Sequence, residues 1–173
     1  MDLIVRLADY DGRSVDVLER IRDTGRPSTS DIDDAIALGC GPDRTVAAGA
    51  TWLLRAWTES GHVPWSPRQW RALIGGLEHV TDPWASLHLA QTVGSMEVPA
   101  RHAEALADFF ERRLDSERPF LRAWAMDALV RIARKDPSVR EAAGRAFRAG
   151  FEDPAASVRA RARRLDAEGG LGG

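Results

Sequence analysis

The sequence has few of the residues that disulfide-bonded, secreted and membrane proteins need. Cys40 is its only cysteine, so the chain forms no internal disulfide, and this usage is typical of a reducing cytoplasm. No stretch approaches the ~18 consecutive apolar residues of a membrane-spanning helix. Residues 1–6 have neither the basic start nor the apolar core of a signal peptide. We therefore expect a cytoplasmic protein with no membrane partner.

Motifs for catalysis and cofactor binding are also missing. The sequence has no His-Glu-x-x-His, Gly-x-Ser-x-Gly or phosphate-binding-loop pattern. Asp31, Asp33 and Asp34 cluster at a helix start, where acidic side chains favour the helix dipole. The histidines, which are not spaced as paired metal ligands, are His62, His79, His88 and His102. The expectation is a protein with no catalytic residues, no metal and no cofactor.

Lysine is nearly absent, since Lys135 is the only lysine among 24 basic residues. The codon usage of a GC-rich genome explains this bias, and so does selection for the bidentate contacts of arginine with carboxylate or phosphate. The net charge is −2, but residues 117–173 carry 12 basic and 8 acidic residues, hence +4. A net acidic chain lacks the extended basic surface typical of nucleic-acid binding, so nucleic acid is a disfavoured partner.

A recurring Asp-Pro pair is what the sequence does contain. Asp82-Pro83 and Asp153-Pro154 open similar segments 71 residues apart, which is two periods of about 35 residues. A related segment beginning at Arg118-Pro119 lies roughly midway, and Asp136-Pro137 opens another apolar-periodic run. A repeat of this length built from helices predicts an array of stacked helix pairs.

Hydrophobic periodicity and helix-end signals predict about nine helices and no strands. The predicted ranges are 14–24, 30–38, 43–60, 66–79, 83–94, 99–115, 119–135, 137–151 and 154–168. Ser14 is the expected N-cap of the first, and the second is expected to start at Ser30. We expect pairs to form between helices 66–79 and 83–94, 99–115 and 119–135, and 137–151 and 154–168. The 43–60 helix would complete an irregular first unit with one or both N-terminal helices.

The second helices of these pairs resemble HEAT repeats, whose pattern is Asp-Pro, variable residues, Val-Arg, two more residues and Ala. Asp153-Pro154, Val158-Arg159 and Ala162 follow the pattern, whereas His88 and Gln91 replace its Arg and Ala in the helix after Asp82. The resemblance covers residues 65–168 and implies an all-α fold, a short right-handed α-α superhelix of the HEAT-like solenoid type. We expect one domain over residues 1–168, with 1–42 as an irregular N-terminal cap and 169–173 as a disordered tail.

In such a solenoid the second helices would line the concave side. In each second helix we take one position expected in the core and use the helical period to find later residues whose side chains point away from the core. The resulting partner-binding candidates are Trp52, Trp124, Asp127, Arg131, Arg161 and Arg164.

Each candidate also has a structural interpretation. Trp52 is either a binding anchor or packs against the helices of 14–38, and Trp124 is either exposed to a partner or part of the core between repeats. Asp127 and Arg131, four residues apart, form either a surface ion pair or a polar pair inside a groove. The basic run around Arg161 is either a solvent-facing end of the array or an anion-binding patch.

Three functional hypotheses follow. The favoured one is a non-catalytic interaction module, or scaffold, that binds a protein or peptide on its concave face. The alternative is nucleic-acid binding resembling that of the HEAT-like DNA alkylation-repair glycosylases, whose groove carries aromatic, acidic and basic residues. Trp124, Asp127, Arg131 and Arg161 are of these types, but their spacing reproduces no motif of that family. The third is an enzyme or carrier with a small molecule next to Trp52. Homo-oligomer formation through a terminal repeat is compatible with all three.

Overall fold

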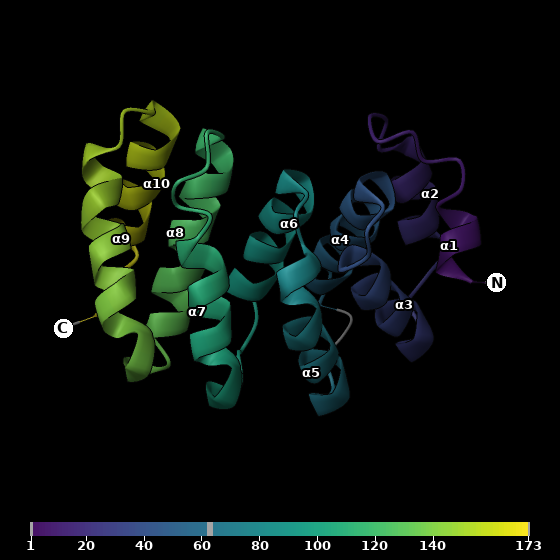
Figure 1. Cartoon of the computed structure of the whole chain (residues 1–173), viewed down its shortest axis with the longest axis horizontal. Helices are drawn as coiled ribbons and strands as arrows, with labels where there is room; N and C mark the ends of the chain where they lie inside the picture. Colours follow the sequence, from purple (N-terminus) through teal and green to yellow (C-terminus); the bar gives the residue numbers. More distant parts are fainter. Residues whose placement is uncertain (1, 62–63, 173) are drawn as a thin grey trace. The chain divides into compact units, whose positions relative to one another are not determined.

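Helices account for all the regular secondary structure of the described residues. The computed structural model describes residues 2–61 and 64–172, and within these ranges it contains ten α-helices, three 3-10 helices and no strand (Figure 1). The prediction of an all-α helical-repeat fold is therefore confirmed. By their contacts the residues form two compact units, Met1–Thr92 and Val93–Gly173. No helix within the described ranges is long and apolar enough to traverse a lipid bilayer.

The first unit contains α1 to α5 and most of α6. Its elements are α1 (Leu3–Arg6), α2 (Asp16–Asp23), α3 (Thr29–Gly39), α4 (Arg44–Glu59), α5 (Pro67–Gly76), the 3-10 helix η1 (Leu77–His79) and α6 (Pro83–Gly94). The four-residue α1 is too short to give a periodic signal and was not predicted. Helix α4 packs against both α2 and α3, the contacts expected of the 43–60 helix with the N-terminal helices.

The second unit contains the remaining four α-helices. Its elements are the 3-10 helix η2 (Ala100–His102), α7 (Ala103–Glu111), α8 (Pro119–Ala133), the 3-10 helix η3 (Pro137–Val139), α9 (Arg140–Glu152) and α10 (Ala156–Ala167). The expected contacts of α7 with α8 and of α9 with α10 are present. Helix α8 also packs against α9 and α10, so it is the central helix of this unit.

Side-chain caps fix where several helices begin. Ser28 caps α3 in a reciprocal capping box with Asp31, two residues before the predicted start at Ser30. Val15 occupies the N-cap position of α2, and the predicted cap Ser14, one residue earlier, accepts a 3.3 Å hydrogen bond from the N–H of Asp16, the first residue of the helix. In α5 the predicted Ser66 start is confirmed by a second capping box, with Gln69.

The recurring Asp-Pro pairs share one local geometry. The carboxylates of Asp82, Asp136 and Asp153 each accept a hydrogen bond from the backbone N–H two residues later, at 2.9, 2.9 and 2.8 Å. The proline follows the aspartate directly, at the start of the helix, where a backbone N–H would have no carbonyl partner within the helix. Asp153 additionally binds the guanidinium of Arg122 on α8 through two hydrogen bonds of 2.9 and 2.8 Å. The sequence repeat is thus a repeat of helix starts.

The core of the first unit lies between α3 and α4. Ala50, Leu53, Leu54 and Trp57, which lie on one side of α4, are buried, and Val46 at its start is half-buried. Close approach of the two helices depends on Gly39, where a Cβ would lie 2.8 Å from Cγ2 of Thr51. The absence of side chains at such positions lets the backbones come close.

The core of the second unit surrounds α8. Ala103, Leu106, Phe109 and Phe110 of α7 are buried. Gly150 of α9 lies directly against Met126 of α8, so that a Cβ at this glycine would overlap the methionine sulfur. Ten of the fifteen residues of α8 are buried, including the charged residue Asp127.

Residues 169–172, which we expected in a disordered tail, form a turn that ends α10. The N–H of Gly170 donates to the Leu165 carbonyl at 2.8 Å, and the N–H of Gly169 donates to Asp166 at 2.9 Å. These are the two bonds of a Schellman motif, and Gly169, at the position after the C-cap, has the positive φ that the motif requires, +98°. The glycine-rich composition therefore supplies a helix end. Residue 173 lies outside the described residues.

Candidate functional site

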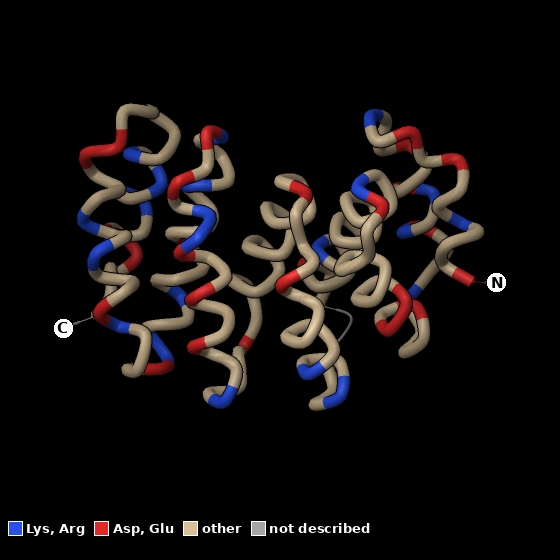
Figure 2. The backbone as a smooth tube through the Cα atoms, viewed as in Figure 1, with Lys and Arg blue, Asp and Glu red and all other residues tan. Residues whose placement is uncertain are grey.

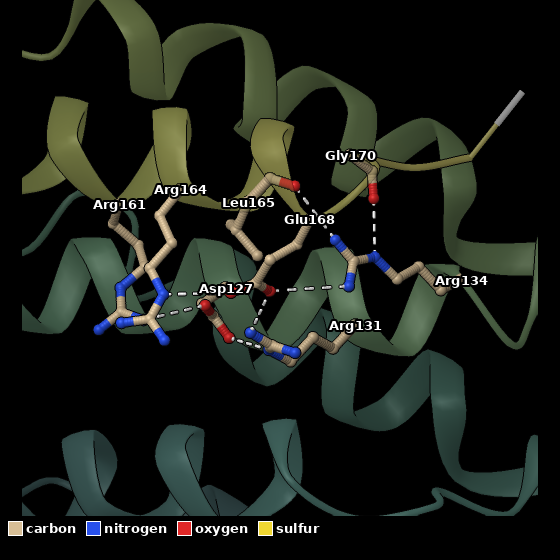
Figure 3. A network of polar contacts seen from close by, with 8 residues as sticks. All are labelled: Asp127, Arg131, Arg134, Arg161, Arg164, Leu165, Glu168 and Gly170. Carbon is tan, nitrogen blue, oxygen red and sulfur yellow. Dashed lines mark hydrogen bonds and ion pairs between the residues drawn. The ribbon is translucent and has the colours of Figure 1, made fainter.

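Helices α8 and α10 bring together five of the six predicted site residues. Trp124, Asp127 and Arg131 lie on α8, and Arg161 and Arg164 lie on α10. In Figure 3 the two arginines extend from α10 toward Asp127, with Arg131 on its other side. We call these five residues, together with Arg134 and Glu168, the α8–α10 cluster.

Asp127 is the centre of the cluster. Its side chain is 1 % exposed, and it accepts a 2.6 Å hydrogen bond from Nε of Arg131. Its other oxygen lies 3.5 Å from a terminal nitrogen of Arg161. Gly94 closes the cluster on another side, because a Cβ there would meet Oδ2 of Asp127 at 3.5 Å. The predicted pair of Asp127 and Arg131 exists, but its acidic member is buried, so it is not an ordinary surface ion pair.

Arg161 stacks on the face of Trp124. The centre of its guanidinium lies 3.7 Å from the indole centroid, which is within the range of a cation–π contact. The Arg161 side chain is 17 % exposed and Trp124 is half-buried. Burial lowers the pKa of Arg161, and Arg164 and Arg131 add to this effect, while Asp127 and Glu168 oppose it. The environment therefore favours a further negative charge next to this guanidinium.

Arg131 is the better neutralised cation. Burial disfavours its charge, but the bonds with Asp127 and Glu168 prevail and raise the pKa of Arg131. Its second carboxylate contact, from a terminal nitrogen to Glu168, measures 2.8 Å. Glu168 in turn lies 3.1 Å from Nε of Arg164, and these arginines hold the pKa of Glu168 below its usual value. Two carboxylates thus lie within 4 Å of four guanidiniums, those of Arg131, Arg134, Arg161 and Arg164.

Arg134 and Glu168 are members of the cluster that sequence reasoning missed. Arg134 donates to the carbonyls of Gly170 at 2.7 Å and Leu165 at 3.2 Å, where a cation complements the helix C-terminus. Their signal was available, because these partners lie 31 to 37 residues apart, close to the repeat period of about 35. Opposite charges separated by one period mark contacts between neighbouring second helices.

Trp52 is not part of the α8–α10 cluster. It lies on α4 in the first unit, where it is half-buried. The guanidiniums of Arg22 and Arg55 lie 5.9 and 5.5 Å from its ring centroid. Since Arg22 belongs to α2, the contact agrees with packing against the helices of 14–38. Arg55 also donates a 3.3 Å hydrogen bond to Gln91, across to α6.

The arginine run of α10 is divided between two environments. Arg163 and Arg164 are exposed, as expected for a polar surface, whereas Arg161 is largely covered. Arg159 bonds the backbone of its own helix start, at the carbonyls of Asp153 and Pro154. Acidic and basic positions are interspersed along the helices of this unit (Figure 2), so the +4 of residues 117–173 is not one uniform basic surface.

Two cavities elsewhere are weaker candidates for a ligand site than the α8–α10 cluster. An open cavity of about 280 Å³ between α1 and α2 contains Arg6, which is already bound by Asp31 at 2.7 Å. A cavity of about 70 Å³ beside Arg122 and Asp153 is smaller than ligand sites usually are. Among residues 2–61 and 64–172 no three His, Cys, Asp or Glu side chains form a group able to hold a metal ion. His62 lies outside these ranges.

Comparison with known proteins provides no function for the α8–α10 cluster, so the cluster is interpreted from its geometry. No family model, curated protein or solved structure matches the chain. The resemblance to HEAT repeats therefore stays a prediction from the sequence pattern.

Proposed function

We propose that the chain is a non-catalytic interaction module that binds a protein or peptide through the α8–α10 cluster. The observation that supports this proposal is the stack of Arg161 on Trp124, at 3.7 Å, beside the buried Asp127. Tryptophan and arginine are the residue types that most often dominate the free energy of protein–protein binding. Here both side chains are partly exposed.

The stack is also held in place before any partner arrives. Trp124 projects from α8, which is packed on α7, α9 and α10. Asp127 orients Arg161 from beneath, and its own position is fixed by Arg131. A partner would therefore meet side chains whose conformational entropy is already reduced, which favours affinity.

The test is affinity capture with the tagged full chain from a lysate of its source cells. The wild type, Arg161→Ala and Arg163→Ala would be compared with and without nuclease, and retained proteins identified by mass spectrometry. Arg163 is an exposed arginine of the same helix, so its variant matches the change in charge. We expect a protein that survives nuclease, is lost with Arg161→Ala and is retained with Arg163→Ala. Recovery that disappears on nuclease treatment would contradict the proposal.

Nucleic-acid binding is the second candidate, and one observation favours it. The structure brings Trp124, Asp127 and Arg161 into contact, which are the residue types that the glycosylase resemblance would require. Against a catalytic role, the Asp127 carboxylate is 1 % exposed and faces two arginines, so it cannot reach a substrate. Against an extended footprint, the chain has a net charge of −2. Binding that falls steeply with rising salt would support this candidate.

A further inference from the structure

Arg161 has more hydrogen-bond donors than the cluster uses. A guanidinium carries five N–H donors. Among residues 2–61 and 64–172, its one hydrogen-bond contact is that to Asp127, at the long distance of 3.5 Å. Its flat face is covered by Trp124. The stack occupies the face of the group and leaves the N–H donors at its edge, where a planar anion binds an arginine.

The balance of charges in the cluster also indicates that Arg161 can bind a further anion. Its four guanidiniums, on Arg131, Arg134, Arg161 and Arg164, face two carboxylates, on Asp127 and Glu168. Asp127 makes its short bond of 2.6 Å to Arg131, and Glu168 makes its two shorter contacts to Arg131 and Arg164. Arg134 is held by the carbonyls at the end of α10. Arg134 lies 3.9 Å from Glu168 but has these two carbonyls as acceptors, whereas Arg161 has only the 3.5 Å contact to Asp127 among the described residues.

We propose that Arg161, with Arg164 one helical turn further along α10, binds a side-chain carboxylate of an acidic peptide segment. This inference rests on the proposed function and names the partner's chemistry. The guanidinium fork matches the two oxygens of a carboxylate, and stacking on Trp124 presets its plane. Arg164 is 68 % exposed and uses one contact on Glu168, so it can also meet a neighbouring acidic residue.

A carboxylate fits the cluster better than a nucleic-acid backbone does. Nucleic-acid binding proteins spread lysine and arginine contacts along many phosphates. Here the cluster has four guanidiniums and two carboxylates, an excess of two positive charges, in a chain whose net charge is −2. The guanidiniums of the cluster already take carboxylates as their partners, at 2.6, 2.8 and 3.1 Å.

The experiment measures fluorescence anisotropy of labelled probes mixed with the full chain. The probes are oligoglutamate, oligolysine and oligothymidylate, each at low and at about 0.15 M ionic strength. We expect oligoglutamate to bind the wild type, and Arg161→Ala to weaken binding about tenfold or more, as removal of a charged hydrogen-bond partner does. Arg163→Ala removes the same charge from an exposed position and should change the affinity by less than about twofold.

A second variant keeps the test valid if Arg161→Ala does not fold, as judged by circular dichroism. Arg161→Lys keeps the positive charge but loses the planar fork, and we expect it to weaken oligoglutamate binding about fivefold. Equal losses in the Arg161 and Arg163 variants would overturn the proposal, because they would indicate general charge attraction. Oligothymidylate binding that is tighter than oligoglutamate binding and depends on Arg161 would also overturn it, in favour of phosphate.

The outcomes separate this inference from the function on which it rests. If lysate capture yields an Arg161-dependent protein but oligoglutamate does not bind, the carboxylate inference fails and the interaction module stands. If capture yields no such protein and oligoglutamate does not bind, both fail.

Discussion

Protonation of His88 should destabilise the fold, because this histidine is buried without a carboxylate partner in contact. It lies on α6, is 8 % exposed, and its Nδ1 is 3.3 Å from the hydroxyl of the fully buried Thr51. Burial, followed by the charge of Arg55, lowers the pKa of His88 to about 4. Asp82 and a bond to the Ala48 backbone act in the opposite direction and do not compensate.

The size of the effect follows from the two pKa values of His88. In the unfolded chain its pKa is near 6.5, so between pH 6.5 and 4 the unfolded chain binds a proton that the folded chain does not. The free energy of unfolding is therefore complete above pH 6.5 and falls as the pH falls through this window. The full loss is about 3 kcal/mol, of which about 2.5 kcal/mol is reached by pH 4.5. Small domains have only about 5–15 kcal/mol in total.

The assay is urea unfolding followed by far-ultraviolet circular dichroism between pH 7.5 and 4.5. His88→Gln cannot be protonated in this range, so we expect its stability to fall with pH by about 2.5 kcal/mol less than that of the wild type. His79→Gln is the control, because the His79 side chain is 65 % exposed. Parallel pH profiles for the wild type and His88→Gln would refute the reasoning, as would an imidazole pKa of His88 near 6.5 by NMR.

Three further predictions concern single positions. Asp127→Asn should lower the free energy of unfolding, measured with urea, by about 3 kcal/mol, because it leaves partly buried guanidiniums without their anion. Asp166→Asn, at an exposed acid, should change the same free energy by no more than about 0.5 kcal/mol. Gly150→Ala should cost about 2 kcal/mol in thermal unfolding by overlap with a methionine sulfur, whereas Gly75→Ala, in open space on α5, should gain up to about 1 kcal/mol. Equal effects of the two alanines would contradict the packing. Burial raises the pKa of the Cys40 thiol to about 11, so its alkylation at pH 8 should be about a hundredfold slower in the folded chain than in denaturant; similar rates would show that the thiol is not buried.

Helix positions could be predicted because the periodic signal is local. Each of the nine predicted ranges overlaps one observed α-helix, and three of them, 66–79, 99–115 and 137–151, also include a 3-10 helix. Helix starts were less predictable where two candidates compete. Ser28 and Ser30 are both suitable caps, and each has an acid three residues later, Asp31 and Asp33, so the local pattern does not distinguish them. In the fold the reciprocal box forms between Ser28 and Asp31.

The site could be predicted in part for the same reason. Counting around single helices gave Trp124, Asp127, Arg131, Arg161 and Arg164, which the fold brings into one cluster. The same counting could not reveal that Asp127 is buried, because its burial comes from α10 and Gly94, which are distant in sequence. Nor could counting around a single helix reveal Arg134, whose partners lie on the end of α10, 31 to 36 residues further along the chain.

The two bonds of Asp153 have a consequence for how the last repeat opens and closes. Its carboxylate holds the first turn of α10 and at the same time holds Arg122 of α8. A helix of 12 residues such as α10 is only marginally stable alone. Because one group both starts this helix and docks it, detachment from α8 weakens the helix start as well. The end of the array is therefore built to unravel in a single cooperative event, without a population of intact but undocked α10.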